Sequence, residues 1–444
     1  MLSREDNELM CRVGPGTGMG AAMRRYWLPA LEAAELPHPD CDPKHVELLG
    51  EHFVAFRDTN GNVGVLDEHC CHRGASLLLG RVEECGIRCL YHGWKFAVDG
   101  TVLETPNVPD PKFKTRFKAR AYPVREAGGL IWAYLGPAEQ CPPFPEFPWM
   151  RIPASNRINA FAVVSCNFVQ VMEGLFDSSH LNILHDYGMA MTGSSTLSFA
   201  QKVSKMQHEA APRIEAEETE FGFHYVALRR NSGAEAGTTL ARIASFIAPC
   251  FVLNPNGDLT FAVVPVNDHK TRFYHVWWDE KRLVGEEPLR SDQLKFVGLD
   301  PHTLAGYGMT DETCDSPGAP SRANRYLQDR EAVRSRRHFT GLPSFSQEDA
   351  AVSISSGAVR DRTKEMLSIA DVAIGRMYQV LLKCARLAQA GGDPVGLLFP
   401  DVARVVGVER TVPDDTPWQS LVPHHRRAGQ AAAVAEPLDA SRTS

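Results

Sequence analysis

Residues 68–94 read EHCCHRGASLLLGRVEECGIRCLYHGW and contain four cysteines and three histidines. The chain has 444 residues, and its eleven cysteines follow no regular spacing, so this cluster indicates a metal site rather than a disulfide framework. The candidate ligands form two short pairs, Cys70-x-His72 and Cys89-x-x-His92. In an extended loop, residues i and i+2 point the same way, so Cys70 and His72 can converge on one centre.

A single zinc ion is the competing interpretation, and Cys71 and Cys85 are the alternative cysteine ligands. Structural zinc sites favour pairs of two cysteines and pairs of two histidines, whereas each loop here carries one of each. That composition suits two metals, because in a Rieske [2Fe–2S] centre two Cys bind one iron and two His bind the other. Gly74 and Gly93 are expected to let the backbone approach the cluster closely.

The motif HRGASL…CLYHGWKF resembles the Rieske domain of the aromatic-ring-hydroxylating oxygenases. That family usually has proline between the first cysteine and histidine, where this chain has Cys71. We expect Cys71 to be a spectator that is open to oxidation if it is exposed.

A second motif, CNFVQVMEGLFDSSHLNILHDYG at residues 166–188, places Asp177, His180 and His185 in the pattern D-x-x-H-x-x-x-x-H. On an ideal helix Asp177 and His180 share a face, whereas His180 and His185 lie about 140° apart. Both histidines can reach one ion only if the helix breaks or tightens between them. Two His and a distant carboxylate form the facial triad of non-haem Fe(II) oxygenases, which leaves positions open for O2.

The carboxylate of this triad is not determined by spacing. Asp186 would diverge from its neighbour His185, and four residues further along the chain compete: Glu348, Asp349, Asp361 and Asp371. The segment FSQEDAAVSISSGAVRDRTKEMLSIADVAI resembles the C-terminal segment of the oxygenases, in which an Asp followed by small apolar residues binds the iron. The resemblance points to Asp349 and leaves Asp361 as an ion-paired residue at a helix start.

The same resemblance gives Asp177 a role other than binding the iron. In the family, the Asp at this position connects the first iron histidine, here His180, to a Rieske histidine of a neighbouring subunit, here His92. A carboxylate fixes the orientation and tautomer of the imidazole that it contacts. Asn167, Gln170 and Glu173 precede it on a similar face and either line the same polar channel or pack in the core.

The pattern of hydrophobic residues and turns predicts an α+β chain. Turn signals at Asn60-Gly61, Asp99-Gly100 and Gly128-Gly129 predict three hairpins of an all-β Rieske domain. Further strand patterns predict a catalytic domain with an antiparallel sheet wrapped around helices, of the helix-grip type. The predicted divisions are a helical arm (1–26), the Rieske domain (27–137), a proline-rich linker (138–153), the catalytic domain (154–422) and a disordered tail (423–444).

Composition excludes several classes of partner. The net charge is -7 and no basic run dominates, so nucleic acid is not expected as a partner. The first residues lack the apolar segment of a signal peptide, and no apolar run approaches the roughly 18 residues that cross a bilayer. We expect a cytoplasmic protein without a membrane partner.

The resemblance extends over nearly the whole chain and is strongest to the phthalate 4,5-dioxygenase-like oxygenases. It implies a terminal oxygenase that hydroxylates an aromatic carboxylate, by cis-dihydroxylation of a phthalate-like ring or alternatively by O-demethylation of a methoxylated acid. It also implies a trimer or stacked hexamer. The chain has no flavin or nicotinamide fingerprint, so electrons are expected from a separate flavin/iron-sulfur, NAD(P)H-dependent reductase.

Candidate substrate residues follow from the expected carboxylate, because the planar fork of Arg binds a carboxylate bidentately. Arg213 and Arg242 are at positions that resemble those of substrate-binding arginines in phthalate-type enzymes. Ser178 and Ser179 either donate a hydrogen bond to substrate or cap a helix, and Ser179 is the preferred candidate donor. Arg242 lies in an apolar strand pattern, where an unpaired charge is costly. Arg229 and Arg230 are expected to be solvated at a strand end.

Two interpretations from other classes remain open at this point. A Rieske electron-transfer protein would carry the cluster but lack the mononuclear iron. A zinc-stabilised binding module would carry neither and would be colourless.

Overall fold

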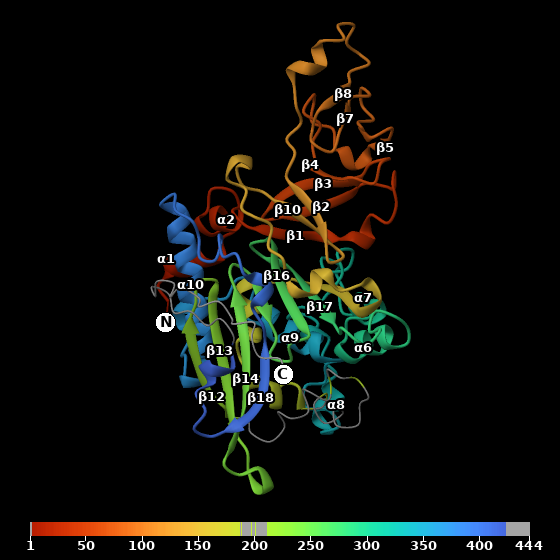
Figure 1. Ribbon diagram of the computed structural model, residues 1–444. Coiled ribbons are helices and arrows are strands. Elements are labelled where there is room, and N and C mark those ends of the chain that lie inside the picture. The colour runs from red at the N-terminus through yellow and green to blue at the C-terminus, as the bar shows by residue number, and fades with distance from the viewer. Residues whose placement is uncertain (1, 187, 189–196, 198–199, 201–210, 423–444) are drawn as a thin grey trace, which may run out of the picture.

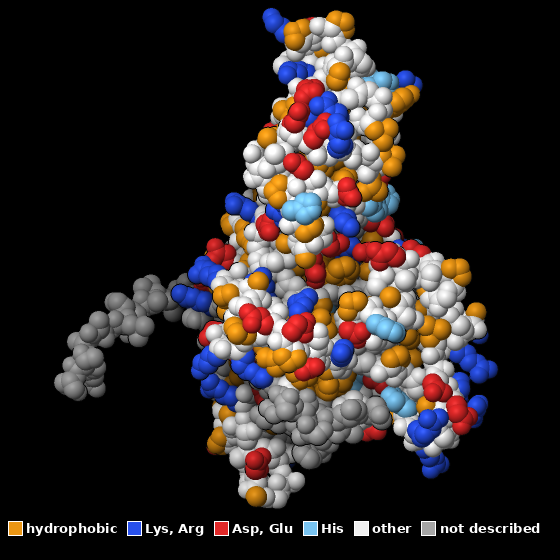
Figure 2. Space-filling model, turned by 90° about the vertical axis from the view of Figure 1, so that its right-hand side faces the viewer, with side chains coloured by type: hydrophobic (Ala, Val, Ile, Leu, Met, Phe, Trp, Pro, Cys, Tyr) orange, Lys and Arg blue, Asp and Glu red, His pale blue; other side chains and the backbone are white. Residues whose placement is uncertain are grey.

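Short apolar runs between glycine-containing turns build the upper part of the molecule from antiparallel strands. The computed structural model describes residues 2–186, 188, 197, 200 and 211–422. This upper part contains a three-stranded sheet, β2-β3-β4, and a four-stranded sheet, β5-β6-β7-β8. It rises from a wider lower body (Figures 1 and 2). Its strands are β2 (Lys44–Leu48), β3 (Glu51–Arg57), β4 (Val63–Asp67), β5 (Arg81–Glu83), β6 (Gly86–Arg88), β7 (Lys95–Phe96) and β8 (Val102–Glu104).

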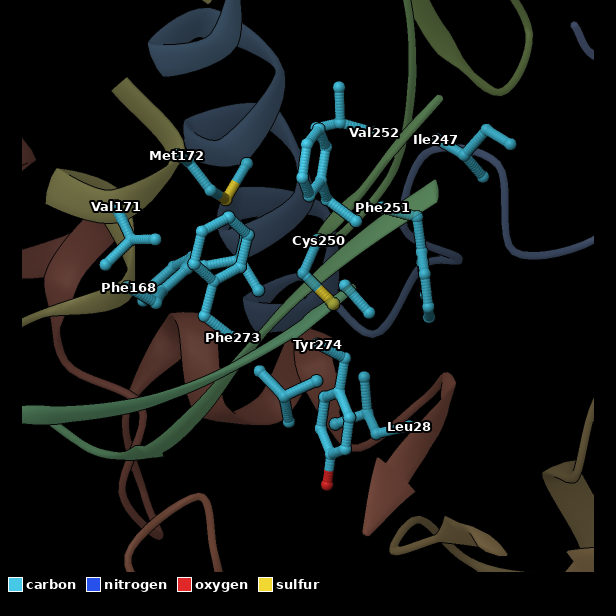
Figure 3. Close-up of a cluster of buried hydrophobic side chains, with 14 of the residues drawn as sticks. Leu28, Phe168, Val171, Met172, Ile247, Cys250, Phe251, Val252, Phe273 and Tyr274 are labelled. Atoms are coloured by element: carbon cyan, nitrogen blue, oxygen red, sulfur yellow. The ribbon is translucent and has the colours of Figure 1, made fainter. Parts of the chain in front are cut away.

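A third small sheet connects the upper part to the body. Its order is β1-β10-β9, and its strands are β1 (Trp27–Glu32), β9 (Val124–Ala127) and β10 (Leu130–Tyr134). In Figure 3, Leu28 of β1 lies in the same buried cluster as side chains of the lower body. Burial of each large apolar side chain contributes roughly 1.5–3 kcal/mol, so this shared core holds the two parts together firmly.

The three expected hairpins are present, but their turns differ from the expectation. Asn60-Gly61, Asp99-Gly100 and Gly128-Gly129 do join β3 to β4, β7 to β8 and β9 to β10. A type I′ turn needs two residues with positive φ, and among these pairs only Gly128 and Gly129 (62° and 75°) satisfy that condition.

An additional turn divides the run VELLGEHFVAF, which reads as one strand. Leu49 and Gly50 both adopt positive φ (53° and 73°) and reverse the chain between β2 and β3. Glycine is common in turns but leucine is rare in that conformation, so Leu49-Gly50 is a weaker turn signal than Asn-Gly or Asp-Gly.

The lower body is an eight-stranded antiparallel sheet with the main order β11-β17-β16-β15-β14-β13-β12, and β18 also pairs with β14. Such a sheet packed with helices gives the α+β class that the sequence predicts. The strands are β11 (Arg157–Val164), β12 (Arg213–Glu218), β13 (Gly222–Arg230), β14 (Thr238–Ile247), β15 (Phe251–Leu253), β16 (Leu259–Asn267), β17 (Lys270–Trp278) and β18 (Val408–Pro413).

Helices cover this sheet (Figure 1). Helix α3 contacts β16, β17 and α9, whereas α10 contacts β12 and β13. Gly391, with a φ of 76°, follows the end of α10. The helices are α1 (Arg4–Cys11), α2 (Gly18–Met23), α3 (Phe168–Leu175), α6 (Leu289–Val297), α7 (Pro301–Gly306), α8 (Arg330–Arg334), α9 (Phe345–Ser355) and α10 (Val372–Gln389).

The N-terminal arm and the proline-rich segment both pack against the rest of the molecule. The arm helices α1 and α2 both pack on α10, so the arm is part of the body rather than a free extension. The proline-rich segment 138–153 forms no strand, yet Phe147 and Trp149 are buried against Trp132. The predicted disordered tail 423–444 lies outside the described residues.

No described helix combines the length and apolar character needed to cross a membrane.

Candidate metal centres

Two loops with the same backbone hydrogen bond form the first site. One follows β4 and the other joins β6 to β7. In each loop the glycine N–H donates to the carbonyl of the cysteine four residues earlier, from Gly74 to Cys70 at 2.9 Å and from Gly93 to Cys89 at 3.0 Å. Both glycines have positive φ, 73° and 74°. Glycine is therefore favoured at both positions by this left-handed turn, in addition to the expected close approach of the backbone to the cluster.

The four predicted cluster ligands lie on these loops and face one another. Cys70 and Cys89 are buried, whereas His72 and His92 are partly exposed with ring centroids 4.6 Å apart. No three of the four bring their described ligand atoms within 4.8 Å of one another, as one metal ion would require. The spread fits a two-iron cluster, with two Cys on one iron and two His on the other.

Neighbouring groups hold these loops. The ring of His72 stacks on Trp94 at 4.5 Å, and the indole N–H of Trp94 donates to Asn107. A separate hydrophobic core that includes Cys70 and Cys89 lies beneath the loops. Cys71 and Cys85, the alternative ligands, are both exposed. The exposure of Cys71 meets the condition under which we expect oxidation.

The second motif breaks its helix as its spacing requires. Helix α3 begins after Asn167, whose side chain accepts from the Val169 N–H, and ends at Leu175. Asp177 lies beyond that end, and a 3-10 turn at His180–Asn182 then redirects the chain. The break lets His180 and His185 face a common point, with ring centroids 5.2 Å apart.

Asp349 on α9 completes this group. Its Oδ1 lies 3.6 Å from His180 Nε2 and 3.2 Å from His185 Nε2. The three ligand atoms lie within 4.8 Å of one another, which suits one metal ion with two His and one carboxylate. Of the other candidates, Asp361 caps a turn and pairs with Lys364, and Asp371 caps Ser368.

Glu348 is a site residue that the sequence prediction missed as a partner of His185. Its Oε2 lies 2.7 Å from His185 Nδ1, and its Oε1 accepts from the Thr340 hydroxyl at 2.5 Å. This carboxylate fixes the ring so that Nε2 faces Asp349. Burial lowers the pKa of His185, but Asp349 and Glu348 together raise it to about 9, so the two carboxylates favour a positive charge on this imidazole.

Replacing Glu348 with Gln is expected to weaken iron binding roughly 10–100-fold, because the carboxylate orients His185 and increases its basicity. Titration of the iron-depleted protein with Fe(II) measures this loss. Glu331→Gln, on the exposed surface of α8, is the matched control. Equal affinity in the two variants would contradict the role of Glu348.

Asp177 lies behind the other imidazole. Its Oδ2 is 3.5 Å from His180 Nδ1, and its Oδ1 accepts from the N–H and hydroxyl of Ser179 at 2.7 and 2.5 Å. Burial raises the pKa of Asp177, but the His180 imidazole and the Ser179 donors outweigh it and lower this pKa to about 2. Asp177 is therefore a fixed anion beside the metal site.

Two cavities meet at these residues. One has a volume of about 300 Å³ and reaches Glu173, Arg360 and Met366, and the other, of about 150 Å³, is mostly apolar. Asp177, His180 and Asp349 line both. The apolar cavity is further lined by Tyr225, Ala244, Val252, Phe261, Phe273 and Trp277.

His275 on β17 also lines the apolar cavity, and the sequence analysis did not single it out. Burial lowers its pKa to about 3, so the ring is neutral. Its Nδ1 lies 3.2 Å from the carbonyl of Phe273, which only accepts, so Nδ1 carries the proton and Nε2 is an acceptor.

The predicted substrate residues separate in space. Arg242 lines the apolar cavity, but its guanidinium also pairs with the partly buried Glu409 and donates to Asn256 at 2.9 Å. Arg213 lies elsewhere, with a side chain 70% exposed beside Glu215. The structure does not bring it to the cavity, because β12 is the edge of the sheet.

The predictions for Ser179 and Arg229 also need correction, whereas Arg230 is exposed at the end of β13 as expected. The hydroxyl of Ser179 is turned toward Asp177, and Ser178 lines the cavity instead. Arg229 is buried rather than solvated, and it donates to the carbonyl and hydroxyl of Ser178 at 3.0 Å.

The polar residues that precede Asp177 mostly serve packing. Asn167 caps α3, and Gln170 donates to the carbonyls of Ser353 and Gly357. Gln170 and Glu173 also line the larger cavity, where Glu173 pairs with Arg360. These residues therefore both pack in the core and, for Gln170 and Glu173, line a cavity, as the two alternatives from the sequence proposed.

The fold and the two ligand groups define an iron-dependent oxygenase. Residues 26–123 match the Rieske [2Fe-2S] domain family, and residues 133–441 match the family described as LigXa C-terminal domain like. The chain belongs to the Rieske non-haem iron oxygenases. It is an enzyme whose cofactors are a Rieske [2Fe–2S] cluster and a mononuclear iron. The electron-transfer protein and the zinc module considered from the sequence are therefore wrong.

The chain is similar over most of its length to several oxygenase subunits whose reactions differ. The chain is 35% identical to the phthalate 4,5-dioxygenase oxygenase subunit of Pseudomonas putida, over 98% of this chain and 99% of that protein. It is 29% identical to the 5,5'-dehydrodivanillate O-demethylase oxygenase subunit of Sphingobium sp., over 99% and 91%. Dicamba monooxygenase, solved with non-heme iron and dicamba, has the same fold, with a TM-score of 0.52 at 16% identity over 83% of this chain and 99% of that one.

Proposed function

We propose that this chain is the terminal oxygenase subunit of a multicomponent system and hydroxylates an aromatic carboxylate, by cis-dihydroxylation of a phthalate-like ring. The observation that carries the proposal is a single cavity that is lined by His180, His185, Asp349 and Arg242. An apolar cavity of about 150 Å³ fits a single aromatic ring beside the metal ligands.

The proposed ligands are chemically suited to the two cofactors. Cys70, Cys89, His72 and His92 would hold the cluster, and His180, His185 and Asp349 would hold the iron. When bound, the cluster supplies single electrons and the iron supplies the position at which O2 is activated. The proposed domain division is the Rieske domain at 27–137 and the catalytic domain at 154–422, with the arm 1–26 and the linker 138–153 packed against them.

The residues of the chain orient the substrate and the ligands. Arg242 is the one guanidinium or ammonium group among the described residues of the apolar cavity, and its N–H groups bind the substrate carboxylate. Glu409 holds the guanidinium in place and offsets its charge before substrate binds. His275, neutral and with Nε2 as an acceptor, receives a hydrogen bond from a substrate hydroxyl or from water.

The proposed partners are a separate NAD(P)H-dependent reductase and further copies of this chain in a trimer. Apolar side chains are exposed at two distant places that would meet in a head-to-tail ring. Leu79 and Leu90 lie in the upper part of the molecule, with 67% and 62% exposure. Met366 lines the larger cavity and Ile369 follows three residues later, with 94% and 88% exposure. Asp177 would then connect His180 to His92 of the next copy, as the resemblance implies.

O-demethylation of a methoxylated aromatic acid is the second candidate. It is supported by the similarity to the O-demethylase subunit over 99% of this chain. The same ligand set serves both reactions, so the position of the ring in the cavity decides between them. Reductase-coupled turnover with phthalates, benzoates and methoxybenzoates, followed by product identification, distinguishes a cis-dihydrodiol from a phenol plus formaldehyde. Absence of any oxygenated product from these acids would overturn the proposal.

Replacing Arg242 with Lys is expected to raise the KM for an aromatic carboxylate by roughly 10–100-fold. A charge-assisted hydrogen bond contributes roughly 1.5–3 kcal/mol, and the lysine ammonium cannot reproduce the fork of the guanidinium. Arg213→Lys, outside the cavity, is the matched control and should leave KM unchanged. The uncharged methyl ester of the same acid should show no difference between wild type and Arg242→Lys. A KM that is unchanged for the acid would contradict the anchoring role.

A further inference from the structure

A third group of metal-ligating side chains lies on the β2-β3-β4 sheet, apart from both oxygenase sites. His45 lies on β2, His52 lies on β3, and Glu68 follows the end of β4. Their ligand atoms lie within 4.8 Å of one another, and both histidines are exposed. The oxygenase chemistry uses none of these three residues.

The strand register explains why they converge. His45 is opposite Val54 and His52 is opposite Glu47, so the two histidines are diagonal neighbours across one strand pair. Diagonal neighbours are within reach when the side chains are aromatic or long. The Glu68 N–H donates to the carbonyl of His52, which places the carboxylate at the other side of the central strand.

The interatomic distances are close to those of a tetrahedral ion. His45 Nε2 lies 3.0 Å from His52 Nδ1 and 3.8 Å from Glu68 Oε2. With Zn–N and Zn–O bonds of roughly 2.0–2.2 Å, ligand atoms of tetrahedral zinc lie roughly 3.3–3.5 Å apart. The two observed separations are on either side of this value, so small side-chain rotations would admit the ion.

The carboxylate is already oriented. Glu68 Oε1 accepts from the Ser76 hydroxyl at 2.6 Å, which leaves Oε2 as the atom nearest His45. The Glu68 carbonyl accepts from the Leu77 N–H at 2.8 Å. Glu68 therefore holds both ends of the first cluster loop, and an ion bound to its Oε2 would tie this loop to β2 and β3.

We propose that His45, His52 and Glu68 bind a divalent transition metal of the zinc class, with a fourth position open to water. Two neutral imidazoles and one carboxylate are a ligand set that zinc uses in proteins with such an open position. The competing structural explanation is a pair of imidazoles joined by one hydrogen bond, without a metal.

The test measures zinc binding by the iron-loaded, full-length protein. Equilibrium dialysis against ZnCl2 with metal analysis is applied to wild type, His45→Gln, His52→Gln and the control His269→Gln. His269 is another exposed histidine, outside the group. All four proteins have the same iron sites and cysteines. A difference in zinc binding between them therefore comes from the hairpin site, which is formed by His45, His52 and Glu68.

We expect wild type and His269→Gln to bind one more zinc ion per chain than either hairpin variant, or to bind it at least roughly 10–100-fold more tightly. Unchanged visible absorption of the Rieske cluster verifies that the variants are folded. Zinc should also raise the thermal unfolding temperature of wild type and His269→Gln but not that of His45→Gln. Identical zinc stoichiometry and affinity in all four proteins would overturn the proposal.

Discussion

Replacing His180 with Ala is expected to abolish substrate oxygenation while the Rieske cluster is retained. The variant loses one of three ligands around the mononuclear iron, so iron content should fall from about three atoms per chain to about two. A metal ion in such a site is worth several kcal/mol of transition-state stabilisation, so turnover should fall by roughly a thousandfold or more. Substrate-dependent O2 consumption, iron analysis and visible absorption measure the three quantities.

The control for this experiment is His302→Ala, an exposed histidine on α7. It should keep all the iron and full activity. A His180→Ala protein that still oxygenates its substrate would show that the metal site at Asp349 is not the reaction centre. A protein that loses its cluster absorption as well would show that the two metal sites depend on each other for folding.

Replacing Asp177 with Asn is expected to keep both metals but lower coupled turnover by roughly 10–100-fold. Asn keeps the shape of Asp and an oxygen for the Ser179 donors. It removes the negative charge, and a hydrogen bond to a neutral acceptor is about half as strong as one to a carboxylate. The orientation of His180, and the proposed connection to His92 of the next copy, both depend on that charge.

Asp186→Asn is the matched control, because Asp186 is an exposed carboxylate beside His185. Iron content should be the same in the two variants, whereas steady-state turnover with the reductase should fall only in Asp177→Asn. Further, Asp177→Asn should still form product in a single turnover when substrate is present and electrons are supplied chemically, at a reduced rate. Unchanged steady-state turnover would remove Asp177 from the connection between the sites.

The local sequence was sufficient to predict the metal ligands that are only a few residues apart in the chain. Cys70 and His72 are two residues apart, and Cys89 and His92 three, so each pair can be recognised within its own loop. The break between His180 and His185 also follows from helix geometry, because a regular helix would turn the two rings away from each other.

Partners from distant parts of the chain were harder to predict. Glu348 and Asp349 are consecutive, and the sequence does not show which binds the metal and which supports His185. On α9 they point in different directions, and the packing of α9 against α3 decides their roles. Likewise, His275 lies among apolar residues of β17, and Arg229 is next to Arg230 at the end of β13. For such residues the sequence does not distinguish a role in the cavity from a role in packing.

The sequence by itself determined the two iron chemistries, the α+β class and most of the hairpins, because each depends on residue types at short, regular intervals. The tertiary structure decided which side chains from β13, β14, β17 and α9 share one cavity. It separated Arg242 from Arg213 and Ser178 from Ser179, since side-chain direction depends on register and on the packing of strands far apart in the chain. The physical reason is that a metal loop encloses its own ligands, whereas a substrate cavity exists only after the sheet and its helices have packed.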